Sequence, residues 1–158
     1  MDHRAGKLVL QNFSENFLVH GVLRGEVSFP VGQVAEPFID AEDIADIAAA
    51  ALTEDRHVGE LYEVTGPRLL TFPQAVAEIS KATGRDIRFV PISAEQFTSA
   101  LLENGLPTDL VTSLVNLITT VLDGRNARLT DGVRRALGRE PRDFADYARS
   151  TAASSVWG

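Results

Sequence analysis

Two helix-start signals within residues 38–91 constrain the fold more than any other feature of this sequence. Asp40 precedes an alanine-rich segment that carries acidic residues at Glu42 and Asp43, the pattern of a helix N-cap and first turn. Thr71 is followed three residues later by Gln74, which matches a capping box. Short runs of strand-forming residues flank both helices, with short connections between them. The sequence therefore predicts an α/β fold.

Strand composition predicts five short strands, at residues 7–10, 26–30, 36–39, 61–65 and 87–91. Helices are expected after Ser14, Asp40, Thr71, Ser93 and Thr130, and at residues 109–122 and 142–153. Apolar spacing predicts a buried stripe on the helix after Asp40, formed by Ile44, Ile47, Ala48, Ala51 and Leu52. The corresponding stripe after Thr71 is Phe72, Ala75, Val76 and Ile79. Helix 109–122 is apolar around most of its circumference, which predicts burial on several sides or a place at an interface.

Size and charge narrow the class of protein. The 158 residues fit a single domain, 1–158. The net charge of −7 is spread along the chain, which disfavours a nucleic-acid partner. The densest basic stretch is interrupted by acids, which favours a solvated helix face over an anion site; it comprises Arg125, Arg128, Arg134, Arg135, Arg139 and Arg142. The sequence has no cysteine, no signal peptide and no membrane-length apolar run, so we expect a cytoplasmic protein without a membrane partner. The histidines are too far apart in sequence to suggest a metal site, and none is expected.

Two longer stretches carry a family resemblance. FIDAEDIADIAAAAL and LYEVTGPRLLTFPQAVAEISKATGRDIRFVP resemble the C-terminal half of NmrA-like proteins, which are atypical relatives of the short-chain dehydrogenase/reductases that bind NAD(P)(H). The resemblance implies the substrate-binding half of a Rossmann-like fold and a nucleotide cofactor, NADP or NAD. In that family a nucleotide-binding half with a glycine-rich phosphate loop comes first. None of the glycines here forms G-x-G-x-x-G or G-x-x-G-x-x-G, and MDHRAGKLVL departs from the family pattern. We therefore expect a truncated chain that lacks the dinucleotide-binding half, and the alternative that it uses no cofactor stays open.

The same resemblance supplies candidate site residues. The family segment that matches residues 11–17 lies over the nicotinamide end of the cofactor and the substrate, and a second segment, around Phe38 and Asp40, lies near the substrate cleft. The substrate-binding candidates are Asn12, Phe13, Asn16, Phe17, Phe38 and Asp40, and Asn12 and Phe13 are also the cofactor-binding candidates. The competing interpretation assigns the phenylalanines to the core and makes Asn12 and Asp40 helix caps. A pocket, if present, is expected between these segments and helix 109–122.

No catalytic residue can be assigned. The short-chain dehydrogenase pair needs a Lys four residues after a Tyr, but Tyr62 is followed at that spacing by Gly66 and Tyr147 by Thr151. The leading hypothesis is the substrate-side portion of an NAD(P)-dependent oxidoreductase or redox-sensing protein, without dehydrogenase activity alone. One alternative is a cofactor-independent module that binds a small apolar or aromatic molecule or dimerises. Another is a cofactor-free isomerase or cyclase with Glu15 or an aspartate as base.

A partner is expected on physical grounds. Half of a sheet leaves unpaired strand edges and apolar faces that the other half normally covers. We therefore expect a homodimer, or pairing with the missing N-terminal half.

Overall fold

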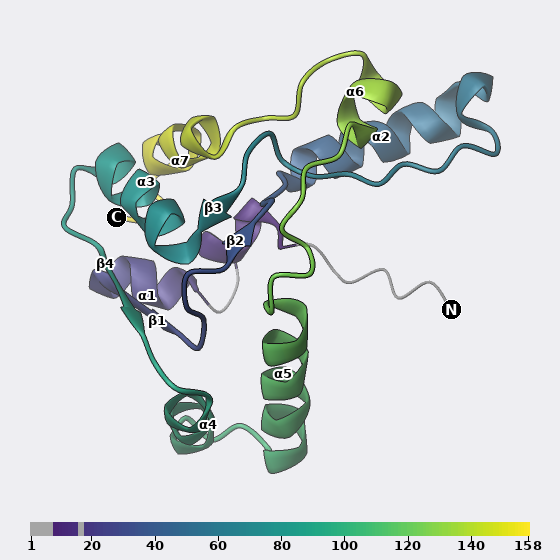
Figure 1. Ribbon diagram of the computed structural model, residues 1–158. Coiled ribbons are helices and arrows are strands. Elements are labelled where there is room, and N and C mark those ends of the chain that lie inside the picture. The colour runs from purple at the N-terminus through teal and green to yellow at the C-terminus, as the bar shows by residue number, and fades with distance from the viewer. Residues whose placement is uncertain (1–7, 16–17) are drawn as a thin grey trace.

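The computed structural model describes residues 8–15 and 18–158. Its helices are α1 (Val19–Arg24), α2 (Ala41–Thr53), α3 (Phe72–Thr83), α4 (Ala94–Glu103), α5 (Thr108–Val121), α6 (Gly132–Leu137) and α7 (Phe144–Ala153), with short 3₁₀ turns η1 (Leu10–Phe13) and η2 (Asp55–His57). Its strands are β1 (Glu26–Phe29), β2 (Ala35–Glu36), β3 (Leu70–Thr71) and β4 (Arg88–Pro91). The fold is α/β and rich in helix, as predicted (Figure 1).

The strands form two small sheets. β1 pairs with β4 in parallel, with Val27 opposite Phe89, and β2 pairs with β3 antiparallel. Of the expected strand at 7–10, residue 7 lies outside the described residues, and residues 8–10 contribute only an isolated parallel bridge between Val9 and Ile39, because the chain turns into η1 at Leu10. The expected strand at 61–65 is wrong: these residues, all described, follow an irregular path.

Helix α3 is the framework of the core. Thr71 and Gln74 form the predicted capping box, and Gly84 ends the helix with a positive φ of 68°. The four residues of the predicted stripe are buried, and α3 lies along α7 (Figure 1). Ser93 and Gln96 form the second predicted capping box, at the start of α4. Capping residues were therefore reliable guides to these two helices.

An aromatic cluster fills the space between η1, α3 and α7. The Phe13 ring lies 5.9 Å from the Phe38 ring, 6.1 Å from that of Phe72 and 5.7 Å from that of Phe144, measured between centroids. Buried Trp157 closes the cluster, and its indole Nε1–H donates a hydrogen bond to the backbone oxygen of Phe13 at 2.8 Å. The two ends of the described chain therefore meet in one core.

The buried stripe predicted for α2 is wrong. Ile44 is 41% exposed and Leu52 87% exposed, whereas the charged Asp43 is completely buried. The helix contacts α6 and the loop that follows it, and the face it presents there is the Asp43 face. Helix α5 likewise buries Val111 and Ile118 but exposes Leu110 and Leu117.

Three helix starts also differ from prediction. Ser14 caps no helix, since α1 begins at Val19 with Leu18 in the N-cap position. The last two helices begin at Gly132 and Phe144, after Asp131 and Asp143, rather than after Thr130 and at Arg142. Across the described ranges, no helix is long and apolar enough to cross a membrane.

The start of α7 is fixed by an ion pair that gives a pH-dependent stability. Hydrogen bonds from Arg68, at 2.8 and 3.0 Å, hold the pKa of the Asp143 carboxyl below its usual value. A depressed pKa means that this stabilisation is present above about pH 4, near the unfolded pKa, and is lost as the pH falls through the folded value. We expect Asp143→Asn, which retains a side chain able to cap α7, to lower the free energy of unfolding at pH 7 by at most about 1 kcal/mol, because both partners are partly exposed.

Urea unfolding at pH 7 and at pH 3 checks this prediction. The difference between wild type and Asp143→Asn should shrink at the lower pH. Asp123→Asn is the control, since Asp123 pairs with Arg125 two residues away and joins no elements. A difference that is the same at both pH values would contradict the prediction.

Candidate functional site

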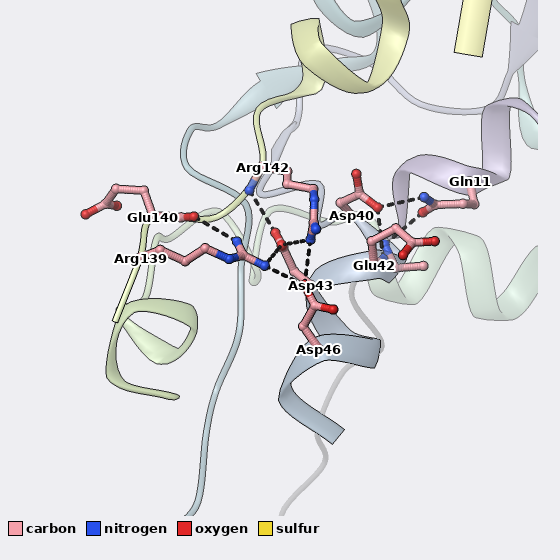
Figure 2. A network of polar contacts seen from close by, with 9 residues as sticks. Gln11, Asp40, Glu42, Asp43, Asp46, Arg139, Glu140 and Arg142 are labelled. Atoms are coloured by element: carbon pink, nitrogen blue, oxygen red, sulfur yellow. Dashed lines mark hydrogen bonds and ion pairs between the residues drawn. The ribbon is translucent and has the colours of Figure 1, made fainter. Parts of the chain in front are cut away.

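The two segments singled out in the sequence meet at the start of α2. The Gln11 side chain bridges them: its Nε2 donates to Oδ1 of Asp40 at 2.8 Å, and its Oε1 accepts from the backbone N–H of Ala41 at 2.9 Å. The same Asp40 oxygen accepts from the backbone N–H of Glu42 at 2.9 Å, so the predicted N-cap is confirmed. Figure 2 shows Gln11 and Asp40 facing each other across this junction. Residue 11 therefore fixes η1 to the first turn of α2.

A groove of about 470 Å³ opens beside this junction. Part of its lining comes from η1 and the residues after it (Gln11, Ser14 and Glu15), and part from the start of α2 (Asp40 and Glu42). A further wall is α7 and the turn that follows it, which contribute Tyr147, Ser150, Thr151, Ser154 and Val156. Arg142 and Asp146 complete the rim. The lining is rich in hydroxyl and carboxylate groups.

Tyr147 is buried at the base of the α7 wall. Its hydroxyl donates a hydrogen bond to Oγ of Ser14 at 2.7 Å, which ties α7 to the segment after η1. Burial raises the pKa of Tyr147 to about 12. A phenol with that pKa is a poor proton donor near neutral pH, and the position four residues later is Thr151, not Lys. The hydrogen bond from Tyr147 therefore orients the Ser14 hydroxyl.

A buried carboxylate supports the groove from behind. Oδ2 of Asp43 accepts from the backbone N–H of Arg142 at 2.8 Å, and Oδ1 accepts from the Arg142 side chain at 2.6 Å. Arg139 reaches the same oxygen at 2.8 Å. Both arginines also donate hydrogen bonds to the Asp46 carboxylate. These hydrogen bonds lower the pKa of Asp46, and the one from Arg142 has the largest effect. Figure 2 shows the two arginines converging on α2, so the loop before α7 is held in place by Asp43.

The predicted site residues fall into three groups. Asp40 lines the groove. Phe13 and Phe38, which are 0% and 3% exposed, belong to the aromatic cluster, and half-buried Asn12 lies in η1 with its backbone N–H bonded to Val9. Asn16 and Phe17 lie outside the described residues. Core packing accounts for the two phenylalanines, and a role in binding stays a prediction for all six.

Sequence reasoning missed most of the groove. Tyr147, Ser150, Thr151 and Ser154 are spaced to lie on one side of a helix, and this hydroxyl face was a signal that could have been read. The expected pocket was placed against helix 109–122, whereas no described residue of α5 lines this groove. Gln11 was in the expected segment but was not chosen.

The basic stretch is neutralised within the chain. Each of its arginines pairs with a carboxylate: Arg125 with Asp123, Arg128 with Glu63, Arg134 with Glu140, Arg135 with Glu60, and Arg139 and Arg142 with Asp43 and Asp46. This favours the solvated face over an anion site. In the part of the chain that the structure describes, no three or more acidic or histidine side chains are grouped to hold a metal ion.

Comparison with known proteins places this geometry in a family. The NAD(P)H azoreductase of Xenophilus azovorans is 34% identical over 145 residues, which are 90% of this chain and 51% of that protein. Triphenylmethane reductase of Citrobacter sp., solved with NADP(H), superposes with a TM-score of 0.76 at 18% identity over 93% of this chain and 51% of that one. NmrA, a negative transcriptional regulator solved with NAD, gives a TM-score of 0.56 at 18% identity over 82% of this chain and 44% of its own. No protein-family model matches the chain.

The chain is similar to the C-terminal half of the NmrA-like, NAD(P)-binding reductases. It spans about half the length of the relatives it matches, so the predicted half of a Rossmann-like reductase fold is confirmed. Among these NmrA-like relatives, triphenylmethane reductase is seen with NADP(H) and NmrA with NAD. In this NmrA-like chain the groove is built from η1, the start of α2, and α7.

Proposed function

We propose that this chain is the substrate-side portion of an NmrA-like NAD(P)-dependent reductase or redox-sensing protein, and that it does not reduce a substrate alone. The observation that carries the proposal is the groove between η1, α2 and α7. It is preformed, is walled by residues from both ends of the described chain, and offers several hydroxyl groups for binding. Such concave sites with convergent polar groups are typical of small-molecule binding. We further propose that the protein acts in the cytoplasm.

The starts of α2, α3 and α4 are poorly suited to a pyrophosphate. Dinucleotide phosphates are bound by free backbone amides at a helix N-terminus that follows a glycine-rich turn. Here the N-termini of α2, α3 and α4 are already capped by Asp40, Thr71 and Ser93. Helix α2 adds the charges of Glu42 and Asp43 in its first turn. The sequence also has no glycine-rich phosphate-loop pattern, and we propose that another polypeptide segment holds the cofactor.

In this proposal the residues of the groove bind and orient the substrate. The Gln11–Asp40 bridge fixes the position of η1, and Tyr147 holds the Ser14 hydroxyl at the groove wall. A bound nicotinamide would supply hydride, and the protein would present the substrate to it. An azo dye or a triphenylmethane dye is the substrate class that the names of the relatives suggest.

Isothermal titration of the purified chain with NADPH, NADH and an azo dye tests the proposal. We expect the dye to bind, no nucleotide binding up to millimolar concentration, and no dye-dependent oxidation of NADPH. The azoreductase of Xenophilus azovorans is the positive control for both binding and turnover. Turnover of NADPH by the chain alone would contradict the proposal.

The proposal includes a partner for the exposed apolar faces. Ile44 and Leu52 on α2 and Leu110 and Leu117 on α5 are open to solvent. Exposed large apolar side chains can mark interaction surfaces. We propose that a second copy, or the dinucleotide-binding half, covers them. A monomer by light scattering at micromolar concentration would exclude the homodimer.

A second candidate is a binding module that works without any nucleotide. The observation that favours it is that none of the glycines in the sequence stands in a G-x-G-x-x-G or G-x-x-G-x-x-G pattern. The test measures thermal unfolding of the chain in the presence of the dinucleotide-binding half of a relative. Stabilisation by an aromatic ligand but not by NADPH would favour the binding module over the reductase portion.

A further inference from the structure

The walls of the groove carry charges that do not balance. Arg142 is the cation among the described residues that line it, and its guanidinium is bound to Asp43 at 2.6 Å and to Asp46 at 3.1 Å. Asp146, on the rim, is paired with Arg149. These pairs cancel their own charges, so neither offers a free cation or anion to a ligand.

Three carboxylates remain, those of Glu15, Asp40 and Glu42. Asp40 is buried and bonded to Gln11 and to the backbone of Glu42. Glu15 and Glu42 are exposed, and within the described residues neither carboxylate has an ion-pair partner. The positive end of α2 offsets part of the charge on Asp40 and Glu42. The groove lining nevertheless stays negative.

The wall formed by α7 and the turn after it supplies neutral polar groups for ligand binding. Ser150, Thr151 and Ser154 offer hydroxyl groups, which can donate or accept hydrogen bonds and so accommodate neutral polar groups. An anionic group in the groove would face three carboxylates, and the described residues that line the groove include no unpaired arginine or lysine to meet it. A cleft lined by one sign of charge concentrates ligands of the opposite sign.

We propose that the groove selects cationic or neutral ligands and rejects anionic ones, and that Glu15 and Glu42 set this selection. The inference rests on the proposed function, because it names the charge class of the substrate for the same groove. The cavity and its hydroxyl wall define the site, and the carboxylates decide the sign of what enters it.

Binding of three azobenzenes with one scaffold tests the selection. The probes carry a trimethylammonium group, a carboxamide or a sulfonate at the same ring position, and affinity is measured by titration at low salt. We expect the cation to bind about tenfold more tightly than the anion, a difference that shrinks with added salt. The double variant Glu15→Gln, Glu42→Gln should reduce that ratio to about twofold.

A matched control is Glu95→Gln with Glu103→Gln, which changes the net charge equally on exposed positions of α4. This variant should keep the ratio of the wild type. Equal binding of cation and anion, or a ratio that falls as much in the control, would overturn the charge selection while leaving the substrate-binding role intact. Failure of all three probes to bind would overturn the proposed function and the selection together.

Discussion

Replacing Asp43 by Asn is expected to lower the free energy of unfolding by about 2–3 kcal/mol. Asp43 is completely buried and accepts hydrogen bonds from the Arg142 backbone and from the side chains of Arg139 and Arg142. Hydrogen bonds to a charged group contribute about 1.5–3 kcal/mol, and removing one partner of a buried pair is costly. The arginines are partly exposed and can regain water, which places the loss below that of a fully buried pair.

Asp46→Asn is the matched control for this change. Asp46 bonds the same two arginines but is partly exposed, and we expect a much smaller loss of stability. Urea unfolding measures both variants, and limited trypsin digestion reports the loop, since Arg139 and Arg142 should be cut faster in Asp43→Asn. Equal losses in the free energy of unfolding for the two variants would mean that the burial of Asp43 adds nothing to its contribution to stability.

Replacing Gly66 by Ala is expected to be at least as damaging, at about 3 kcal/mol or more. A Cβ at this position would lie 1.8 Å from the backbone oxygen of Phe38, so the backbone itself must move. Gly66 also donates its backbone N–H to the oxygen of Pro37 at 3.2 Å. Overpacking costs about 1–3 kcal/mol where side chains can yield, and a rigid backbone places this case at the upper end or beyond. The strained segment would be the one that leads to Asp40.

Gly32→Ala separates this clash from the general effect of adding a methyl group. The Cβ at Gly32 meets no atom within 4 Å, so that variant should be neutral or slightly more stable. Thermal unfolding should place Gly66→Ala roughly 6–12 °C below the wild type. If both variants melt together, the close approach of residue 66 to Phe38 is not present in solution.

Local sequence patterns predicted the structure correctly where it depends on residues close together in the sequence. Asp40, Thr71 and Ser93 each cap the helix they were expected to cap, since the side chain and the amide it bonds lie within three residues. The inward face of α3 followed from its spacing because α3 lies on α7, which covers that face. These features need no knowledge of distant residues.

The predictions of the buried face of α2 and of the groove failed, because both depend on contacts with segments that are distant in the sequence. Apolar spacing on α2 pointed to Ile44 and Leu52, yet the face that is covered holds Asp43, because Arg139 and Arg142 return to it from about a hundred positions later. The groove shows the same limit: Ser14 meets Tyr147 across 133 positions. No local sequence pattern predicts such long-range pairings, although the spacing of the hydroxyl residues on α7 could be recognised in the sequence.

The contact between Trp157 and Phe13 joins residues 144 positions apart, and it bears on how the protein is made. One wall of the groove emerges from the ribosome early and the other late, so a nascent chain that ends before α7 has no groove to present. Synthesis must therefore reach the last helix before any ligand can favour the folded state. The chain has a single tryptophan, which sits at this junction, so its emission reports when the two walls have come together.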